Sequence, residues 1–246
     1  MQLYGLIGYP LGHSFSKQYF THKFQTEHIK NAQFELYPLT SITALPNLLL
    51  QTPQLKGLAV TIPYKEAVMP YLTHINDTAL QIGAVNCITI NDGELTGYNT
   101  DVTGFEQSLQ PLLQPYHKKA LVLGTGGAAK AVQFVLNKLG IDYVIVSRSK
   151  QQHKNSITYN DIDKTILQQY LLIINCTPLG MHPNVSSLPA IPYQYLTPQH
   201  LLYDLVYQPA VTAFLQQGLH QHTLVKNGYD MLAIQAEANW QIWNNI

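Results

Sequence analysis

A glycine-rich turn between two apolar segments is the part of this 246-residue chain whose residue types and spacing most clearly suit chemistry. Gly124, Gly126 and Ala129 match the spacing G-x-G-x-x-G/A and follow the apolar run 120–123 directly. In this fingerprint the first glycine makes a tight turn, the second lets the backbone approach a pyrophosphate, and the third small residue lets helix pack on strand. The helix N-terminus then binds the anion. The pattern favours a dinucleotide site, although a tight turn without a ligand would use the same residues.

The residues that end the second apolar segment, 143–146, indicate which dinucleotide is bound. An NAD site places Asp or Glu about 20 residues beyond the glycines, whereas an NADP site places a cation there for the 2′-phosphate. Here the segment is followed by Ser147 and Arg148, and no carboxylate stands among residues 147–150. Arg148 is the only arginine in the chain, and its planar guanidinium suits a phosphate. We expect NADP(H); a solvated cation at a strand end is the alternative.

A hairpin in the N-terminal half gathers further polar residues. Asp92-Gly93 lies between two apolar-rich segments, which is a strong signal for a two-residue turn. Counting outward from this turn pairs Asn86 with Asn99 and leaves Asp101 two residues beyond. The open end of the hairpin therefore holds two amides and a carboxylate, which are more polar side chains than the end of a strand requires.

Lys65 follows the predicted strand 55–62, in the first turn of a helix that Pro63 would begin. The helix macrodipole opposes a cation at this position, and a residue placed against local preference at a strand end hints at function. An ordinary exposed lysine would also be tolerated there.

The loop after the first predicted strand, 3–9, carries His13, Ser14 and Ser16 at the start of a helix over 15–29. Two hydroxyls beside free backbone N–H groups could bind a carboxylate. One of the serines could equally be a simple helix cap.

The elements that position these residues alternate between strands and helices, as in an α/β protein. The remaining expected strands are 34–39, 85–90, 94–98, 120–123, 143–146, 171–175, 201–206 and 223–226, and the remaining helices are 42–50, 102–113, a short one ending at 170, 211–220 and 230–244.

Two further expectations concern loops and the last helix. The turn 176–181 would lie at the carboxyl edge of the sheet, where cofactors bind. Gly228 would admit a positive φ before the last helix, on which an apolar stripe indicates the core-facing side. That stripe consists of Met231, Ile234, Ala238 and Ile242.

The composition excludes some classes of function. The formal charge is zero and only 11% of residues are charged, against about 25% typically, which argues against a nucleic-acid or anionic-membrane partner. The two cysteines are far apart, and neither a leader segment nor an 18-residue apolar run is visible, so we expect a reduced, cytoplasmic protein. No metal-binding motif stands out among the ten histidines, and we expect no metal.

With these motifs in place, the chain resembles the shikimate dehydrogenase family over nearly its full length. The motifs occur in the family's order: Gly8-Tyr9-Pro10 with His13-Ser14-Phe15-Ser16, Val60 to Glu66, Gly83 to Asn86 with Gly97 to Asp101, Gly124 to Ala128 with Ser147-Arg148-Ser149, Asn175 to Met181, and Gly228 to Leu232 with Gln235-Ala236. The resemblance implies an N-terminal α/β substrate domain, 1–102 with 229–246, and a Rossmann-type NADP-binding domain, 103–228, with a cleft between them.

The resemblance also implies an activity, the NADPH-dependent reversible reduction of 3-dehydroshikimate to shikimate in aromatic amino acid biosynthesis. Hydride transfer to a ketone builds negative charge on oxygen, which a positioned cation stabilises in the transition state. We expect a monomer or a homodimer. The implied residues are Lys65 and Asp101 for catalysis, Ser14, Ser16, Thr61, Asn86, Tyr207 and Gln235 for the substrate, and Gly124, Gly126, Gly127, Ala128, Ser147, Arg148, Thr177, Gly228 and Met231 for the cofactor.

Two positions depart from the family pattern. Ser147 replaces a usual Asn, which should leave the role of Arg148 intact, and Ala59 replaces the usual Asn before Val-Thr. Ala59 offers no hydrogen bond, so we expect a weakened enzyme. Two other functions remain open: an oxidoreductase for quinate or another cyclic hydroxy acid, and a non-catalytic NADPH-binding module, against which the gathered Lys65, Asn86 and Asp101 argue.

Overall fold

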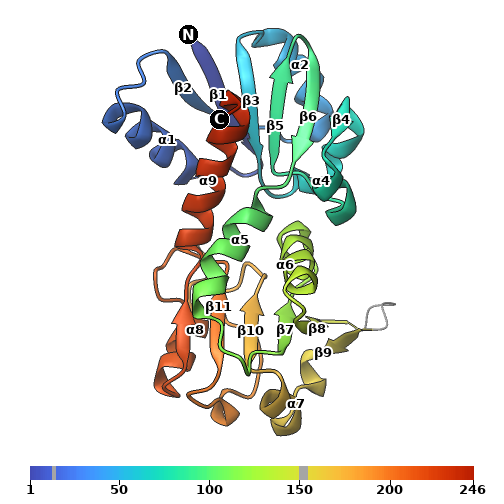
Figure 1. Cartoon of the computed structure of the whole chain (residues 1–246), viewed down its shortest axis with the longest axis vertical. Helices are drawn as coiled ribbons and strands as arrows, with labels where there is room; N and C mark the ends of the chain where they lie inside the picture. Colours follow the sequence, from blue (N-terminus) through green and yellow to red (C-terminus); the bar gives the residue numbers. More distant parts are fainter. Residues whose placement is uncertain (13–14, 150–154) are drawn as a thin grey trace. The chain divides into compact units, whose positions relative to one another are not determined.

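The computed structural model of the protein describes residues 1–12, 15–149 and 155–246, and its helices and strands are labelled in Figure 1. The chain divides into two compact units. Unit 1 comprises Met1–Thr103 and Ala233–Ile246, and unit 2 comprises Gly104–Leu232. Both units are built of helices packed on a six-stranded sheet, so the predicted α/β class is confirmed.

The sheet of unit 1 has the strand order β2-β1-β3-β5-β6-β4. β1 pairs in parallel with β2 and β3, whereas β5 runs antiparallel to both β3 and β6. The predicted hairpin is confirmed, because Asn91 pairs with Glu94 and both loop residues, Asp92 and Gly93, have positive φ. The strands are β1 Gln2–Gly8, β2 Ala32–Pro38, β3 Leu55–Val60, β4 His74–Ile75, β5 Cys87–Asn91 and β6 Glu94–Tyr98.

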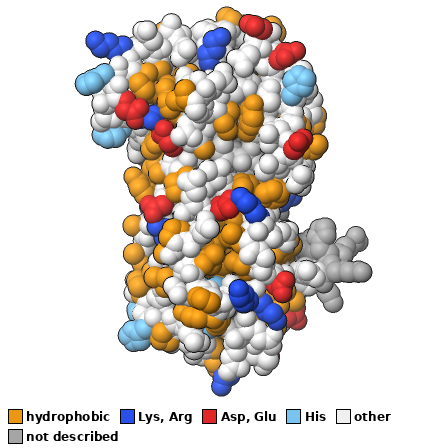
Figure 2. Space-filling model, in the orientation of Figure 1, with side chains coloured by type: hydrophobic (Ala, Val, Ile, Leu, Met, Phe, Trp, Pro, Cys, Tyr) orange, Lys and Arg blue, Asp and Glu red, His pale blue; other side chains and the backbone are white. Residues whose placement is uncertain are grey.

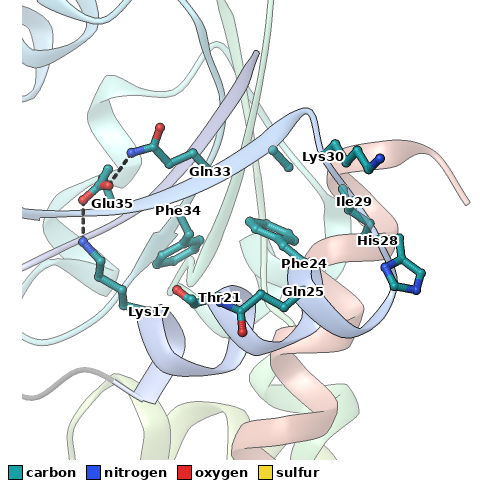
Figure 3. Close-up of a pocket in the computed structure, with 11 residues that line it drawn as sticks. Lys17, Thr21, Phe24, Gln25, His28, Ile29, Lys30, Gln33, Phe34 and Glu35 are labelled. Carbon is teal, nitrogen blue, oxygen red and sulfur yellow. Dashed lines mark hydrogen bonds and ion pairs between the residues drawn. The ribbon is translucent and has the colours of Figure 1, made fainter.

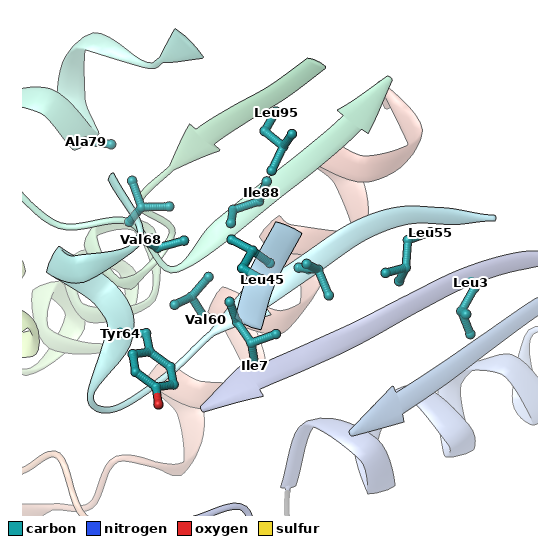
Figure 4. Packing of buried hydrophobic residues seen from close by; sticks show 12 residues of the cluster. Leu3, Ile7, Leu45, Leu55, Val60, Tyr64, Val68, Ala79, Ile88 and Leu95 are labelled. Atoms are coloured by element: carbon teal, nitrogen blue, oxygen red, sulfur yellow. The ribbon is translucent and has the colours of Figure 1, made fainter. Parts of the chain in front are cut away.

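Helices cover both faces of this sheet, because side chains alternate along each strand. Leu3 and Ile7 of β1 pack in the cluster that includes Leu45, Tyr64 and Val68 (Figure 4). The helices of unit 1 are α1 Phe15–Thr26, α2 Leu45–Gln51, α3 Tyr64–Ala67 and α4 Asp77–Ile82, with short 3₁₀ turns at Ile42–Ala44 and Met69–Tyr71. Unit 1 also contains the start of α5 Asp101–Leu109, up to Thr103, and most of α9 Tyr229–Asn244, from Ala233 onward.

The opposite face of the sheet is covered by α1 and α9 through an aromatic cluster. Tyr4 of β1 lies 5.1 Å from Trp243, and Phe20 lies 4.7 Å from Phe34, between ring centroids. The predicted apolar stripe of the last helix is correct only in part: Met231 is buried and Ile242 packs against this cluster, but Ile234 and Ala238 are not among its residues. The buried residues of α9 in the cluster are Ala236, Trp240 and Trp243, because the large indole rings offer the most apolar area to the sheet.

The sheet of unit 2 is parallel throughout, with the order β12-β11-β10-β7-β8-β9. Numbered within the unit, this order is 6-5-4-1-2-3, which is the Rossmann arrangement. The strands are β7 Lys119–Leu123, β8 Asp142–Ser147, β9 Ser156–Thr158, β10 Leu172–Asn175, β11 Leu201–Asp204 and β12 Leu224–Lys226. The short strand β9 was not predicted, because it falls within a polar segment that reads as loop.

Helices of unit 2 pack on this sheet through strands that read as continuous apolar runs. Leu121 and Leu123 of β7 and Leu202 of β11 belong to one buried cluster with Phe214 of α8. Phe105 of α5 meets the ring of Tyr203 edge to face at 5.2 Å. The helices are α6 Gly127–Lys138, α7 Lys164–Gln169, α8 Ala213–His220 and the remainder of α5 and α9, with 3₁₀ turns at Gln110–Leu112, Tyr159–Asp161 and Tyr193–Tyr195.

The surface reflects the sparse charge of the chain. Charged residues make up 11% of the sequence, and Figure 2 shows small, separate groups of them among uncharged polar and hydrophobic side chains. Within the part of the chain that the structure describes, no helix is long and apolar enough to cross a membrane. Over the same residues, no group of His, Cys, Asp and Glu is arranged to hold a metal ion.

Candidate active site

An ion pair between Lys65 and Asp101 lies at the centre of the polar cluster in unit 1. Lys65 is on α3, directly after β3, and Asp101 is the first residue of α5. Lys65 Nζ donates to Asp101 Oδ2 at 2.5 Å, with 16% and 7% of the two side chains exposed. The backbone supports this placement, because Val85 N donates to Lys65 O at 2.7 Å. The two residues predicted to form a catalytic pair are therefore in contact.

The hairpin brings Asn86 to the same carboxylate. Asn86 Nδ2 donates to Asp101 Oδ1 at 2.8 Å, and Asn86 Oδ1 accepts from Thr100 N at 2.7 Å. The predicted gathering of Asn86 and Asp101 at the open end of the hairpin is confirmed. Asn99 has a different role, since its Nδ2 donates to Ala84 O at 2.8 Å and so holds the backbone of the hairpin end.

Gln235 of α9 completes the cluster, together with a residue that the sequence did not single out. Gln235 Oε1 lies 3.4 Å from Asn86 Nδ2 and also 3.4 Å from Nδ2 of Asn239, one turn further along the helix. Thr100 Oγ1 donates to Asn239 Oδ1 at 2.6 Å. A pair of polar residues four apart on a helix is the signal that could have identified Asn239.

For the other predicted substrate-binding residues, the structure gives the position and burial of Ser16, Thr61 and Tyr207. Ser16 is buried in the first turn of α1, and Thr61 is half-buried, directly after β3. Tyr207 is half-buried in unit 2, three residues beyond β11. Ser14 and the adjacent His13 lie outside the described residues.

Ala59 is 5% exposed, on β3 beside Leu6 and Cys87 in the neighbouring strands. It packs in the cluster that contains Ala236 and Trp240 of α9. Position 59 thus lies under the helix that carries Gln235.

In unit 2, the glycine turn has the geometry that the fingerprint requires. Gly124 has a φ of +110°, and a Cβ there would lie 3.0 Å from Thr177 Cγ2. Gly126 caps α6, and a Cβ there would meet nothing within 4 Å, so its backbone is open to an approaching ligand. Ala129 is fully buried against the sheet. Gly127 and Ala128 lie between them, in the first turn of α6.

Ser147 is the last residue of β8, the strand that pairs with β7, and Arg148 follows it. Ser147 is buried and its Oγ donates to Ser149 O at 2.5 Å, which shapes the turn, while Arg148 is exposed. The binding of a phosphate by Arg148 stays a prediction.

A buried carboxylate anchors the two loops that follow β10 and β11. Asp204 accepts from Asn175 Nδ2 at 2.9 Å, from Val206 N at 3.0 Å and from Thr212 Oγ1 at 2.5 Å. Asn175 Oδ1 in turn accepts from Thr177 Oγ1 at 2.6 Å. Burial raises the pKa of Asp204 to about 6, against the lowering effect of these hydrogen bonds.

Glycine is needed at position 228 for a different reason from the predicted one. Its φ is not positive, but a Cβ there would lie 2.1 Å from Leu205 O, so glycine is required by a close backbone approach. Met231 is buried in the first turn of α9, three residues later.

A shallow pocket elsewhere in unit 1 contains none of the predicted site residues. It lies between α1 and the edge strand β2, and Figure 3 shows Phe34 between Phe24 and the ion pair of Lys17 and Glu35. The chemistry described above is therefore concentrated at the ends of strands rather than in this pocket.

The fold and these residues together define a class of protein. Unit 2 is a Rossmann-type dinucleotide-binding unit with a cation after its second strand, and unit 1 presents a lysine–aspartate pair beside amide side chains. This combination is typical of a nicotinamide-dependent oxidoreductase.

Comparison with known proteins gives the family. Residues 6–88 match the model of the shikimate dehydrogenase substrate binding domain. The NADP⁺ shikimate dehydrogenase of Carboxydothermus hydrogenoformans is 36% identical over 261 residues, covering 100% of this chain and 92% of the relative. The chain belongs to the shikimate dehydrogenase family.

Solved structures agree with this assignment. Shikimate dehydrogenase 1 from Peptoclostridium difficile has a TM-score of 0.89 and 33% identity, covering 100% of this chain and 92% of that one. The enzyme from Thermus thermophilus in complex with NADP(H) and shikimate has a TM-score of 0.88 and 28% identity, covering 100% and 94%.

Proposed function

We propose that this chain is an enzyme that catalyses the NADPH-dependent reversible reduction of 3-dehydroshikimate to shikimate, a step in aromatic amino acid biosynthesis. The observation that carries the proposal is the Lys65–Asp101 pair, 2.5 Å apart and largely buried, with Asn86 bonded to the same carboxylate. Membership of a family whose members include NADP⁺ shikimate dehydrogenases supports the same reaction.

Lys65 is the residue that acts on the reacting oxygen. Its ammonium group stabilises the negative charge that develops on the ketone oxygen and donates the proton that makes the hydroxyl. Asp101 fixes the direction of the ammonium group, and Asn86 fixes the carboxylate. In the oxidation of shikimate the same groups work in reverse, so the lysine–aspartate pair accepts the proton of the hydroxyl.

Polar residues of unit 1 bind the rest of the substrate. Ser14 and Ser16 bind the carboxylate, and Thr61, Asn86, Asp101 and Gln235 bind the hydroxyls. Tyr207 is also proposed as a substrate-binding residue. The contacts of Asn86 with Asp101 at 2.8 Å and with Gln235 at 3.4 Å support this assignment, because they join both amides to the proposed catalytic pair. We propose that unit 1 is the substrate domain.

Unit 2 binds NADP(H), which supplies the hydride when bound. The open backbone at Gly126 and the positive φ of Gly124 fit a pyrophosphate at the start of α6, with Gly127 and Ala128 adding backbone N–H groups. Ser147 and Arg148 receive the 2′-phosphate. Thr177, Gly228 and Met231 complete the cofactor site. We further propose a cytoplasmic monomer or homodimer.

The experiment that tests this proposal is a steady-state assay of NADP⁺ reduction with shikimate, run in parallel with quinate. We expect turnover with shikimate and a higher kcat/KM than with quinate. A preference for quinate would show that the substrate is a cyclic hydroxy acid other than shikimate. Tight NADPH binding without turnover would contradict the proposal that the chain is an enzyme.

A further inference from the structure

Two buried residues, Thr100 and Asn239, contact the proposed substrate-binding amides without being proposed substrate contacts themselves. They are 2% and 1% exposed. Thr100 contacts Asn86 through its backbone N–H, and Asn239 contacts Gln235 through its side-chain amide. All four residues belong to unit 1. The network they form determines which end of each amide is oxygen and which is nitrogen.

The first constraint comes from Thr100. A backbone N–H can only donate, so the atom of Asn86 that lies 2.7 Å from Thr100 N is the oxygen Oδ1. Nδ2 of Asn86 is then on the other side of the amide, where it donates to Asp101 at 2.8 Å. Its second N–H faces the side-chain amide of Gln235 at 3.4 Å. Because Asn86 Nδ2 can only donate, the atom of Gln235 that it contacts must be the acceptor, Oε1.

The second constraint comes from Asn239. The hydroxyl of Thr100 carries one hydrogen and has two acceptors within reach, Asn239 Oδ1 at 2.6 Å and Asn86 Oδ1 at 3.1 Å. The shorter contact favours donation to Asn239, which directs Nδ2 of Asn239 to Gln235 Oε1 at 3.4 Å. If Asn239 were reversed, its oxygen would face the oxygen of Gln235. Two donors, one from Asn86 and one from Asn239, thus face the same oxygen.

We propose that Asn239 and Thr100 are positioning residues that hold Gln235 with Oε1 toward the protein, so that Gln235 meets the substrate with Nε2, as a donor. This inference rests on the proposed function, in which Gln235 bonds a substrate hydroxyl. It assigns direction to that bond: the hydroxyl oxygen accepts from Gln235. A ligand with a donor-only group at this position is disfavoured, because two N–H groups would face each other.

Asn239→Asp is the sharpest test, because it is nearly isosteric and replaces the donor by an acceptor. Thr100 Oγ1 can still donate to the new carboxylate, but the carboxylate attracts Nε2 of Gln235 instead of Oε1. Hydrogen bonds to charged groups are about twice as strong as neutral ones, so this attraction outweighs the opposing contact with Asn86. Gln235 then turns its oxygen to the substrate.

The measurement is KM and kcat for shikimate, and KM for NADP⁺, in Asn239→Asp, Gln235→Ala and the double variant. We expect Asn239→Asp to raise KM for shikimate about tenfold, with kcat changed less than about threefold and KM for NADP⁺ unchanged. In the Gln235→Ala background the same substitution should have no further effect. Asn244→Asp is the matched control on α9, and it should leave KM for shikimate unchanged.

A second pair of variants covers the case in which Asn239→Asp does not fold, as judged by its Tm. Thr100→Val removes the hydroxyl that orients Asn239 and should raise KM for shikimate, whereas Thr100→Ser keeps the hydroxyl and should restore the wild-type value. An active wild type with unchanged KM in Asn239→Asp, or an effect that persists without Gln235, overturns the inference alone. A wild type without shikimate turnover overturns the proposed function and the inference with it.

Discussion

Replacing Lys65 by alanine removes the only group in the unit 1 cluster proposed to stabilise charge on the reacting oxygen. The ammonium is held in place before reaction, since its Nζ lies 2.5 Å from Asp101 and only 16% of its side chain is exposed. Losing one preorganised donor to a developing oxyanion lowers kcat by about 10²–10³-fold, and losing proton transfer contributes about 10²–10⁴-fold. Because these two effects belong to one group, we expect a total loss in kcat of about 10³-fold.

Binding of the substrate should change much less. Asn86 and Gln235 keep their mutual contact in the variant, and Asn86 keeps its bond to Asp101. We therefore expect KM for shikimate to rise by less than about fivefold, which is the signature of an interaction made mainly in the transition state.

Stability must be followed in the same experiment. Asp101 is 7% exposed at its side chain, and breaking a buried ion pair destabilises a protein by about 3–5 kcal/mol. The hydrogen bond from Asn86 remains, so the loss should lie at or below the lower end of this range. The assay therefore includes Tm, and it is run well below the Tm of the variant.

The assay follows NADPH formation by its absorbance, with saturating NADP⁺ and varied shikimate. Lys56→Ala is the matched control, because Lys56 is an exposed lysine on β3, whose end precedes Lys65. It should keep wild-type kcat and KM. A rise in KM without loss of kcat in Lys65→Ala would refute the reasoning and assign Lys65 to substrate binding.

Three further predictions address cofactor choice, position 59 and pH. Arg148→Ala should reduce the preference for NADP⁺ over NAD⁺, measured as a ratio of kcat/KM values, by roughly 10- to 150-fold, because a charge-assisted hydrogen bond contributes about 1.5–3 kcal/mol; an unchanged ratio would remove Arg148 from the phosphate site. Ala59→Asn should raise kcat/KM for shikimate at least severalfold without altering NADP⁺ affinity, because asparagine can bond a substrate hydroxyl and alanine cannot. It should also lower Tm, because position 59 lies among apolar side chains. Kinetics equal to wild type would mean that a water or another residue already bonds this substrate hydroxyl. Burial lowers the pKa of His200, so the unfolded chain takes up this proton at higher pH than the folded chain, and stability is lost as the pH falls below about 6.5. When the pH is lowered from about 7.5 to about 5.5, the unfolding free energy of His200→Gln should fall less than that of the wild type. The raised pKa of Asp204 favours the folded state as the pH falls, and it does so equally in both proteins. An equal fall in both proteins would show that His200 is not the cause.

Local sequence signals predicted the parts of the site that lie close to turns. The Asp92-Gly93 pair fixes the register of β5 and β6, and that register alone brings Asn86 near Asp101. The glycine spacing likewise predicted the turn before α6, because a positive φ at Gly124 and an open backbone at Gly126 are local requirements.

Contacts that depend on tertiary packing could not be predicted in this way. The apolar residues of α9 fit more than one helical stripe, and the choice of Trp240 and Trp243 follows from the aromatic side chains of β1 and α1 on which they pack. Asn239 could be placed only once that face was known. The sequence predicts a turn residue at Gly228, since nothing in it shows that Leu205 O approaches this position.

The most direct test of the central claim is the rate at which the purified wild-type protein reduces NADP⁺ in the presence of shikimate. The account predicts a rate that saturates with shikimate, is higher with NADP⁺ than with NAD⁺, and falls about 10³-fold in Lys65→Ala. Tight NADPH binding with no shikimate-dependent turnover in the folded wild type would contradict it.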